Sequence, residues 1–277
     1  MKNKRLGLLL LIALLASATL AQKKPLTLSS EDEIKADLKL VPCKNVDRLV
    51  AVRTLFEKKG AAEADITVDK MKDVQNVVFI KKGKTDEIVV IGAHYDKVSE
   101  GCGAIDNWTG IVIIANIFRT LKQMDTDKTY VFVAFDKEES GLVGSAAMVK
   151  SIPKEKRAAY CSMVNLDSFG FGYPQVLENA STPKMTTAAK DLAAELKMPF
   201  SSVSLAGVAD ADSSSFKDKD IPAVTFHGLD NRWRQFLHSS NDKLENINAA
   251  SVWVGYNFLL QYLAKIDSSS CGIFRNK

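Results

Sequence analysis

The chain contains several short, almost continuous runs of apolar residues. The runs at 88–91, 130–135, 161–166 and 223–226 have the length and composition of central strands covered on both faces. Between them, residues 109–124 are apolar on all sides, and apolar residues recur at helical spacing around 185–196 and 252–263. Strands that alternate with helices predict one α/β domain, with a mixed, mostly parallel central sheet and helices on both faces.

The segments nearer the N-terminus give weaker patterns. Asn45 is predicted to cap a helix that runs to Lys59 and stops at Gly60, with an apolar face of Val46, Leu49, Val50 and Phe56. Residues 75–80 and 88–91 flank the polar KKGK segment, which predicts a hairpin-like pair of strands. Residues 23–36 are polar and indicate a leader or a first helix.

The first 21 residues have the pattern of a secretory signal peptide. Lys2, Lys4 and Arg5 precede an apolar stretch at 6–15, and cleavage is expected after Ala18 or Ala21. The apolar stretch is shorter than the roughly 20 residues that span a bilayer, so no stable membrane anchor is expected after cleavage. We therefore expect an exported protein, periplasmic or extracellular, with a signal peptide at 1–21, a leader at 22–44 and one domain at 45–277.

Charge and cysteine content fit export. The net charge of +4 falls to +1 in the mature chain, because the signal peptide at 1–21 carries three positive charges and no negative ones. The basic lysine clusters are typical of solvated turns and indicate no nucleic acid partner. Four cysteines in an exported protein predict two disulfides, and their three possible connectivities stay open. None of the four forms a CxxC pair, which disfavours a structural zinc knuckle.

Acidic residues and histidine follow the predicted strands. His94 and Asp96 come after the first run, Glu138 and Glu139 after the second, and Asp167 after the third. Ligands of open α/β sheets collect beyond the carboxyl ends of the strands, so these side chains are expected at one edge of the sheet. Asp106 and His238 complete the candidate set.

Imidazole nitrogens and carboxylate oxygens are the donors that a two-zinc site needs. Such a site lowers the pKa of a water and polarises a carbonyl, and a free carboxylate accepts the proton. Glu138 and Glu139 would supply one ligand and one base, although their pattern does not say which is which. A lone HxD or paired EE is more often a surface feature. Their combination in this order favours a hydrolytic metal centre.

Five segments resemble a known family. GAHYD, GAIDNWTG, AFDKEESGLVGS, NLDSFG and HSSNDKLENIN, in this order, look like the M28 family of co-catalytic zinc aminopeptidases. The resemblance runs from about residue 76 to 264 and implies a zinc-exopeptidase-like fold for the domain at 45–277. It also implies a hydrolase that uses two Zn²⁺ ions and acts on peptides from the N-terminus. The oligomeric state stays open, with a monomer favoured.

The same resemblance assigns roles to residues. His94 and Asp167 would hold one zinc ion, Glu139 and His238 the other, and Asp106 would bridge them. Glu138 would be the general base. Asp96 would orient the imidazole of the ligand His94, which fixes its tautomer. Asp212, in DSSSF, resembles an acidic loop motif of the family and is expected to be structural.

Four further residues are candidates for the substrate pocket. His227 follows the run at 223–226 and would line the pocket or stabilise an oxyanion, whereas a hydrogen-bonded structural histidine is equally consistent with its position. Trp108 would shape the pocket or pack under the loop of Asp106. Trp233 and Arg234 precede His238 and would contact substrate, although an exposed loop with one packed tryptophan is also consistent. Cys102 is expected to brace the Asp106 loop by a disulfide.

Two other functions fit the pattern less well. A glutaminyl cyclase-like acyltransferase uses a related scaffold with one zinc ion, and a non-catalytic binding protein would keep the scaffold without activity. The intact ligand set and Glu138 argue against the second. M20-type carboxypeptidases and deacylases are disfavoured, because only 71 positions separate Asp167 from His238 and leave no room for their inserted domain.

Overall fold

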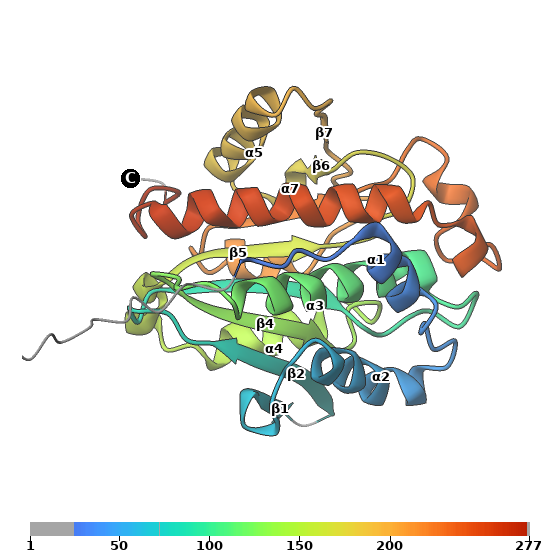
Figure 1. Cartoon of the computed structure of the whole chain (residues 1–277), viewed down its shortest axis with the longest axis horizontal. Helices are drawn as coiled ribbons and strands as arrows, with labels where there is room; N and C mark the ends of the chain where they lie inside the picture. The colour runs from blue at the N-terminus through green and yellow to red at the C-terminus, as the bar shows by residue number, and fades with distance from the viewer. Residues whose placement is uncertain (1–24, 72, 276–277) are drawn as a thin grey trace, which may run out of the picture.

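The protein is built around one eight-stranded sheet (Figure 1). The structure, a computed structural model, describes residues 25–71 and 73–275, so the predicted signal peptide lies outside the described residues. The strand order is β1-β2-β4-β3-β5-β8-β6-β7. The strands are β1 Ile66–Met71, β2 Val74–Lys81, β3 Ile88–His94, β4 Thr129–Phe135, β5 Tyr160–Leu166, β6 Gln175–Leu177, β7 Ser202–Val203 and β8 Ala223–His227.

The four central strands, β4, β3, β5 and β8, run parallel. β2 joins β4 antiparallel on one side and β6 joins β8 antiparallel on the other, so the sheet is mixed, as predicted. Because parallel strands end at the same edge, the loops after β3, β4, β5 and β8 meet there. We call the side of the sheet at the carboxyl ends of these parallel strands the ligand edge, and the side at their amino ends the opposite edge.

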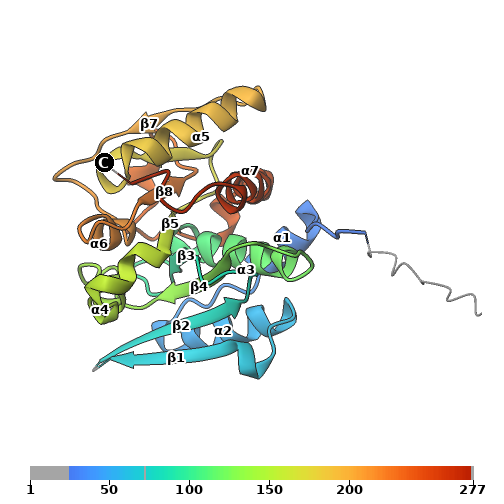
Figure 2. The same cartoon turned by 90° about the vertical axis from the view of Figure 1, so that its left-hand side faces the viewer.

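Helices cover both faces of the sheet (Figure 2). One core holds side chains of α1, α2, α3, α5 and α7, and a second core holds side chains of α4 and α6. Figure 1 views the face that carries α1, α3 and α7. The α-helices are α1 Glu31–Leu38, α2 Asn45–Lys58, α3 Thr109–Leu121, α4 Val143–Ser151, α5 Pro183–Glu195, α6 Ser213–Lys217 and α7 Ala249–Ser268. The single α/β domain is therefore confirmed.

Three local predictions were wrong in whole or in part. β2 and β3 do not form a hairpin-like pair, because β4 lies between them and β2 pairs instead with β1 and β4. The predicted apolar face of α2 was half right. Leu49 packs against the core and Phe56 is fully buried. Val46, however, is 84% exposed and Val50 63%, whereas Arg48 is fully buried. Asn45 does not cap α2. Its side-chain amide instead donates to the carbonyl of Lys97 and accepts the backbone N–H of the same residue.

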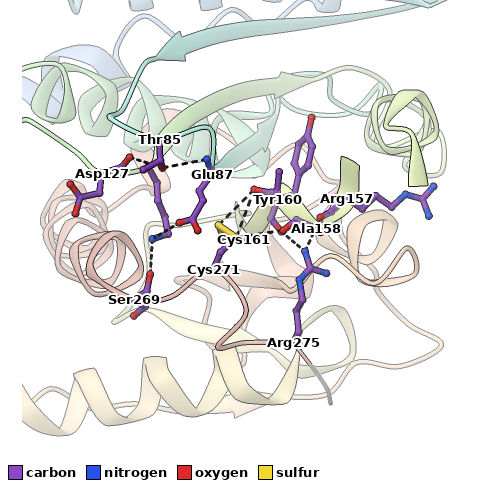
Figure 3. The surroundings of a disulfide bond; sticks show 12 residues. Thr85, Glu87, Asp127, Arg157, Ala158, Tyr160, Cys161, Ser269, Cys271 and Arg275 are labelled. Atoms are coloured by element: carbon purple, nitrogen blue, oxygen red, sulfur yellow. Dashed lines mark hydrogen bonds and ion pairs between the residues drawn. A yellow bond between two sulfur atoms is a disulfide. The ribbon is translucent and has the colours of Figure 1, made fainter. Parts of the chain in front are cut away.

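Two disulfides brace opposite edges of the sheet, as the even cysteine count predicted. Cys43–Cys102 joins the segment before α2 to the loop that leads to Asp106. Cys161–Cys271 joins the start of β5 to the C-terminal tail, where Arg275 donates to the carbonyls of Arg157 and Tyr160 (Figure 3). Among the described residues, no helix is long and apolar enough to cross a membrane.

Candidate functional site

The predicted metal ligands meet at the ligand edge. His94 ends β3, Asp167 follows β5 directly, and Glu138 and Glu139 lie in the turn after β4. Asp106 lies in a short helical turn, η2 (Ala104–Trp108), immediately before α3, and His238 comes from the loop after β8. Residues separated by up to 144 positions (238 − 94) are therefore brought into one site.

Asp106 lies between the two imidazoles. Its Oδ1 is 3.0 Å from His94 Nε2, and its Oδ2 is 3.3 Å from His238 Nε2. His94 Nε2 is also 3.6 Å from Asp167 Oδ1, and His238 Nε2 is 3.0 Å from Glu139 Oε2. Each imidazole thus shares Asp106 and has one further carboxylate of its own.

Asp96 connects His94 to the turn that carries both glutamates. Its carboxylate accepts the backbone N–H of Glu138 at 3.0 Å and of Glu139 at 3.2 Å. On the His94 side, the imidazole Nδ1 lies 3.2 Å from the Asp96 carbonyl and 3.4 Å from its Oδ1. These acceptors favour a proton on Nδ1, which leaves Nε2 free to act as a metal ligand.

The charges of the site shift several pKa values. Burial raises the pKa of the Glu138 carboxyl well above its usual range; His94 opposes this shift, and the nearby Asp167, Asp212 and Asp106 add to it. Hydrogen bonds to Asp106 and Glu139 raise the pKa of His238 to about 10. Glu139 Oε1 is buried without a hydrogen-bond partner. The excess of carboxylates and this unsatisfied oxygen both favour bound cations.

Two residues that support the Asp106 turn were missed in the sequence. The Asp242 carboxylate accepts the N–H of Ile105 at 2.6 Å and of Asp106 at 3.3 Å, and burial raises its pKa to about 6. The Asn107 side chain donates to Leu166 O and accepts from Gly110 N and Ser168 N. The Asp242 carboxylate could have been suspected because it follows His238 by four positions.

The backbone is strained at one candidate residue and directly beside two others. His238 has φ 56°, Ser168 after Asp167 has φ 62°, and Lys137 before Glu138 has φ 56°. Side chains other than glycine rarely adopt this left-handed region, and such strain is concentrated at functional sites. The loops at this edge therefore hold their side chains in conformations that the surrounding structure imposes.

A cleft of about 650 Å³ opens onto the site. Its walls carry the apolar side chains Leu177, Val203, Leu205, Val208, Leu229 and Leu237. Six acidic residues and two histidines line it, and none of its described lining residues is Lys or Arg. The cleft thus combines apolar and negatively charged lining residues.

The four candidate pocket residues separate into two pairs. His227 and Trp233 line the cleft, and burial lowers the pKa of His227 to about 4, which keeps its imidazole neutral. Trp108 lies outside the cleft, because it is fully buried under the Asp106 turn, with its indole N–H donated to Asp37 O. Arg234 stacks over the Trp233 ring instead of lining the cleft.

Asp212 is fully buried close to the site. Both of its carboxylate oxygens lack hydrogen-bond partners, and burial raises its pKa to about 7. At the opposite edge, Glu87, Cys161 and Cys271 also lie close together, but both sulfurs are consumed by the disulfide and cannot act as thiolate ligands.

Comparison with known proteins gives a family match over most of the chain. Residues 76–263 match the peptidase family M28. Aminopeptidase YwaD of Bacillus subtilis is 31% identical over 190 residues, which are 63% of this chain and 40% of that protein. The chain therefore spans less than half the length of this relative.

Solved structures share the fold. A zinc aminopeptidase from Bacillus subtilis superposes with a TM-score of 0.61 at 22% identity, over 72% of this chain and 52% of that one. A glutaminyl cyclase from an Acidobacteriales bacterium superposes with a TM-score of 0.73 at 15% identity, over 89% of this chain and 99% of that one. At these identities the likeness establishes the fold alone.

Proposed function

The chain belongs to peptidase family M28, and we propose that it is an exported, zinc-dependent aminopeptidase. One observation carries this proposal: the two Asp106 oxygens face two different imidazoles, at 3.0 and 3.3 Å. A carboxylate in this position is suited to bridge two ions. His94 and Asp167 would hold one zinc ion, and Glu139 and His238 the other.

The side chains around the site fit these ions. Imidazole and carboxylate are common zinc donors, and the buried Glu139 Oε1 lacks any other partner. Zinc, when bound, supplies Lewis acidity that makes water more acidic and polarises a carbonyl. Glu138 lines the cleft, and its raised pKa suits a carboxylate that takes a proton and then passes it to the leaving amine.

The cleft favours the amino end of a peptide. A carboxylate at the carboxyl end would normally be bound by arginine or lysine, and none of the described lining residues is either. A positively charged α-amino group would instead meet the carboxylates of the site. The apolar wall, which includes Leu177 and Leu229, would accept an apolar N-terminal side chain.

Export is supported by the signal-peptide pattern at 1–21 and by the two disulfides. Disulfides persist mainly outside the cytosol, and this chain has no free cysteine among its described residues. Cell fractionation with N-terminal sequencing tests export, since the mature protein should begin after Ala18 or Ala21. A full-length cytosolic product would contradict it.

The activity is tested with aminoacyl-coumarin substrates. Hydrolysis of leucyl-coumarin should be abolished by a chelator and restored by zinc, and the matched N-acetyl-leucyl substrate should stay intact, because it lacks the free amine. Hydrolysis that survives the chelator would contradict the metal mechanism. Binding of peptides without turnover would favour a binding protein.

A glutaminyl cyclase is the second candidate, because the cyclase structure matches 89% of this chain and 99% of its own length. An M28 aminopeptidase should bind two zinc ions and release free amino acids, whereas a cyclase should bind one and convert an N-terminal glutamine into pyroglutamate. A glutaminyl-peptide followed by mass spectrometry separates the two, because cyclisation releases ammonia and leaves the peptide bond intact.

A further inference from the structure

Arg48 is a fully buried arginine in the first turn of α2. All of its described hydrogen bonds go to backbone carbonyls: Nε donates to Tyr95 O, Nη1 to Pro42 O and Cys102 O at 2.9 Å, and Nη2 to Gly103 O at 3.0 Å. The guanidinium also lies 5.8 Å from the centre of the Trp108 ring. One side chain thus joins three separate segments.

Those carbonyls belong to the loops that carry the candidate ligands. Tyr95 lies between His94 and Asp96, and Cys102 and Gly103 begin the loop that reaches Asp106. At Gly103 the chain has φ 59°, and an added Cβ would come within 3.0 Å of Arg48 Nη1. The two ligand loops are therefore packed closely around the guanidinium.

A covalent bond reinforces the same junction. Cys43, beside Pro42, is disulfide-bonded to Cys102, so the segment before α2 is tied to the Asp106 loop. Asn45 adds a paired contact, donating to Lys97 O at 2.8 Å and accepting Lys97 N at 3.0 Å. We call Arg48 and the Cys43–Cys102 disulfide the α2 clamp.

The clamp has two separable physical effects. Burial lowers the pKa of Arg48 to about 10, so the guanidinium remains charged at neutral pH. Its positive charge stabilises the ionised form of the nearby carboxylates. Its planar fork also fixes four carbonyls at once, which a lysine ammonium cannot do. Without the fork, buried carbonyls on both ligand loops would lose their donors and the loops would shift to find new ones.

We propose that Arg48 is a positioning residue for the metal centre, and that the α2 clamp sets the separation between His94 and Asp106. This inference rests on the proposed zinc function. Partners outside the ligand sphere typically change metal affinity by about 10- to 100-fold, and the clamp acts on two ligands together.

Zinc affinity, measured by competition with a chromophoric chelator, tests the proposal. Arg48→Met and Arg48→Lys should both weaken zinc binding by about 10- to 100-fold and change the absorption spectrum of the cobalt-substituted protein. Arg275→Met is the matched control, because Arg275 also donates to three backbone carbonyls, but at the opposite edge. It should keep wild-type zinc affinity even where thermal stability falls.

The outcomes are distinguishable. If Arg48→Lys binds zinc as the wild type does, charge alone suffices and the positioning role is wrong. If both Arg48 variants keep wild-type affinity and cobalt spectrum, the whole inference is wrong while the proposed function stands. A wild-type protein that binds no zinc overturns the proposed function itself. Should Arg48→Met not fold, Cys43→Ser/Cys102→Ser in the same titration must weaken zinc binding, and unchanged affinity would overturn the proposal.

Discussion

Each of the two edges of the sheet is held by one arginine and one disulfide, but the segments that they hold differ in function. At the ligand edge, Arg48 and the Cys43–Cys102 disulfide hold the loops of His94 and Asp106. At the opposite edge, Arg275 and the Cys161–Cys271 disulfide hold the C-terminal tail against β5 (Figure 3). Both arginines bind backbone carbonyls, but only the first set belongs to loops with metal-binding side chains.

The comparison shows that the effect of such an arginine–disulfide pair depends on which segments it holds together. All three histidines of the chain, at 94, 227 and 238, lie at the ligand edge. The strained residues beside Asp167 and Glu138 lie there as well. Changes at this edge should therefore alter metal binding, catalysis and pH dependence, whereas equivalent changes at the opposite edge should alter stability alone.

The largest expected effect is on catalysis. Glu138→Gln should lower kcat by about 10²- to 10⁴-fold, because the amide cannot accept a proton, while zinc content stays unchanged. The measurement is steady-state hydrolysis of leucyl-coumarin beside metal analysis. Glu87→Gln is the control at the opposite edge, where Glu87 pairs with Lys128 at 3.2 Å, and it should stay within about twofold of wild-type kcat. Full activity in Glu138→Gln would rule out the assigned base.

Removing each disulfide should separate stability from metal binding. The bridges enclose 59 and 110 residues, so chain entropy predicts losses of about 4 kcal/mol for Cys43–Cys102 and about 5 kcal/mol for Cys161–Cys271. Denaturant unfolding of the serine double variants measures both. Only Cys43→Ser/Cys102→Ser should also lose zinc affinity. Equal zinc loss in both variants would erase the distinction between the edges.

His227 should make the free energy of unfolding depend on pH. Its pKa in the folded protein is about 4, below its ordinary 6.5, so the unfolded chain binds the proton first as the pH falls. Its contribution to stability is therefore lost between pH 6.5 and 4, at up to about 1.4 kcal/mol per pH unit. In denaturant titrations with chelator present, His227→Gln should flatten this slope, whereas Arg275→Met should keep it. An unchanged slope in His227→Gln would refute the buried neutral imidazole.

The smallest effect is expected on the exposed side of α2. Val46→Lys should change the free energy of unfolding by no more than about 0.5 kcal/mol, because Val46 is 84% exposed. Leu55→Ala on the buried side should cost about 2–5 kcal/mol. Thermal unfolding of the two variants compares them. A strong loss of stability in Val46→Lys would contradict the exposed position of Val46 and support the apolar helix face predicted from the sequence.

The central fold was predictable because its strands are buried on both faces. Continuous apolar runs at 130–135 and 161–166 correspond to β4 and β5 almost residue for residue. The pairing of β2 was not predictable, because short sequence separation favours a hairpin with β3, and only the tertiary fold places β4 between them. The strands toward the two sides of the sheet, β1, β6 and β7, were not predicted either, because their apolar patterns are too short or too weak to indicate strands.

The candidate ligands were found because each follows a strand, whereas their supports follow no such rule. Arg48 lies outside the apolar face that the sequence predicts for α2, and its acceptors are backbone carbonyls, which every residue has. Asp242 binds backbone N–H groups more than 130 positions away. Trp108 could be placed under the Asp106 turn, outside the cleft, only once α1 supplied its acceptor, Asp37 O.

Native mass spectrometry of the zinc-loaded protein tests the central claim most directly, because it counts bound ions on the folded chain. The wild type should carry two zinc ions, and Asp106→Ala, which removes the carboxylate between His94 and His238, should carry at most one. A wild type with one ion or none, or an Asp106→Ala variant that keeps two, would contradict the bridged two-zinc centre.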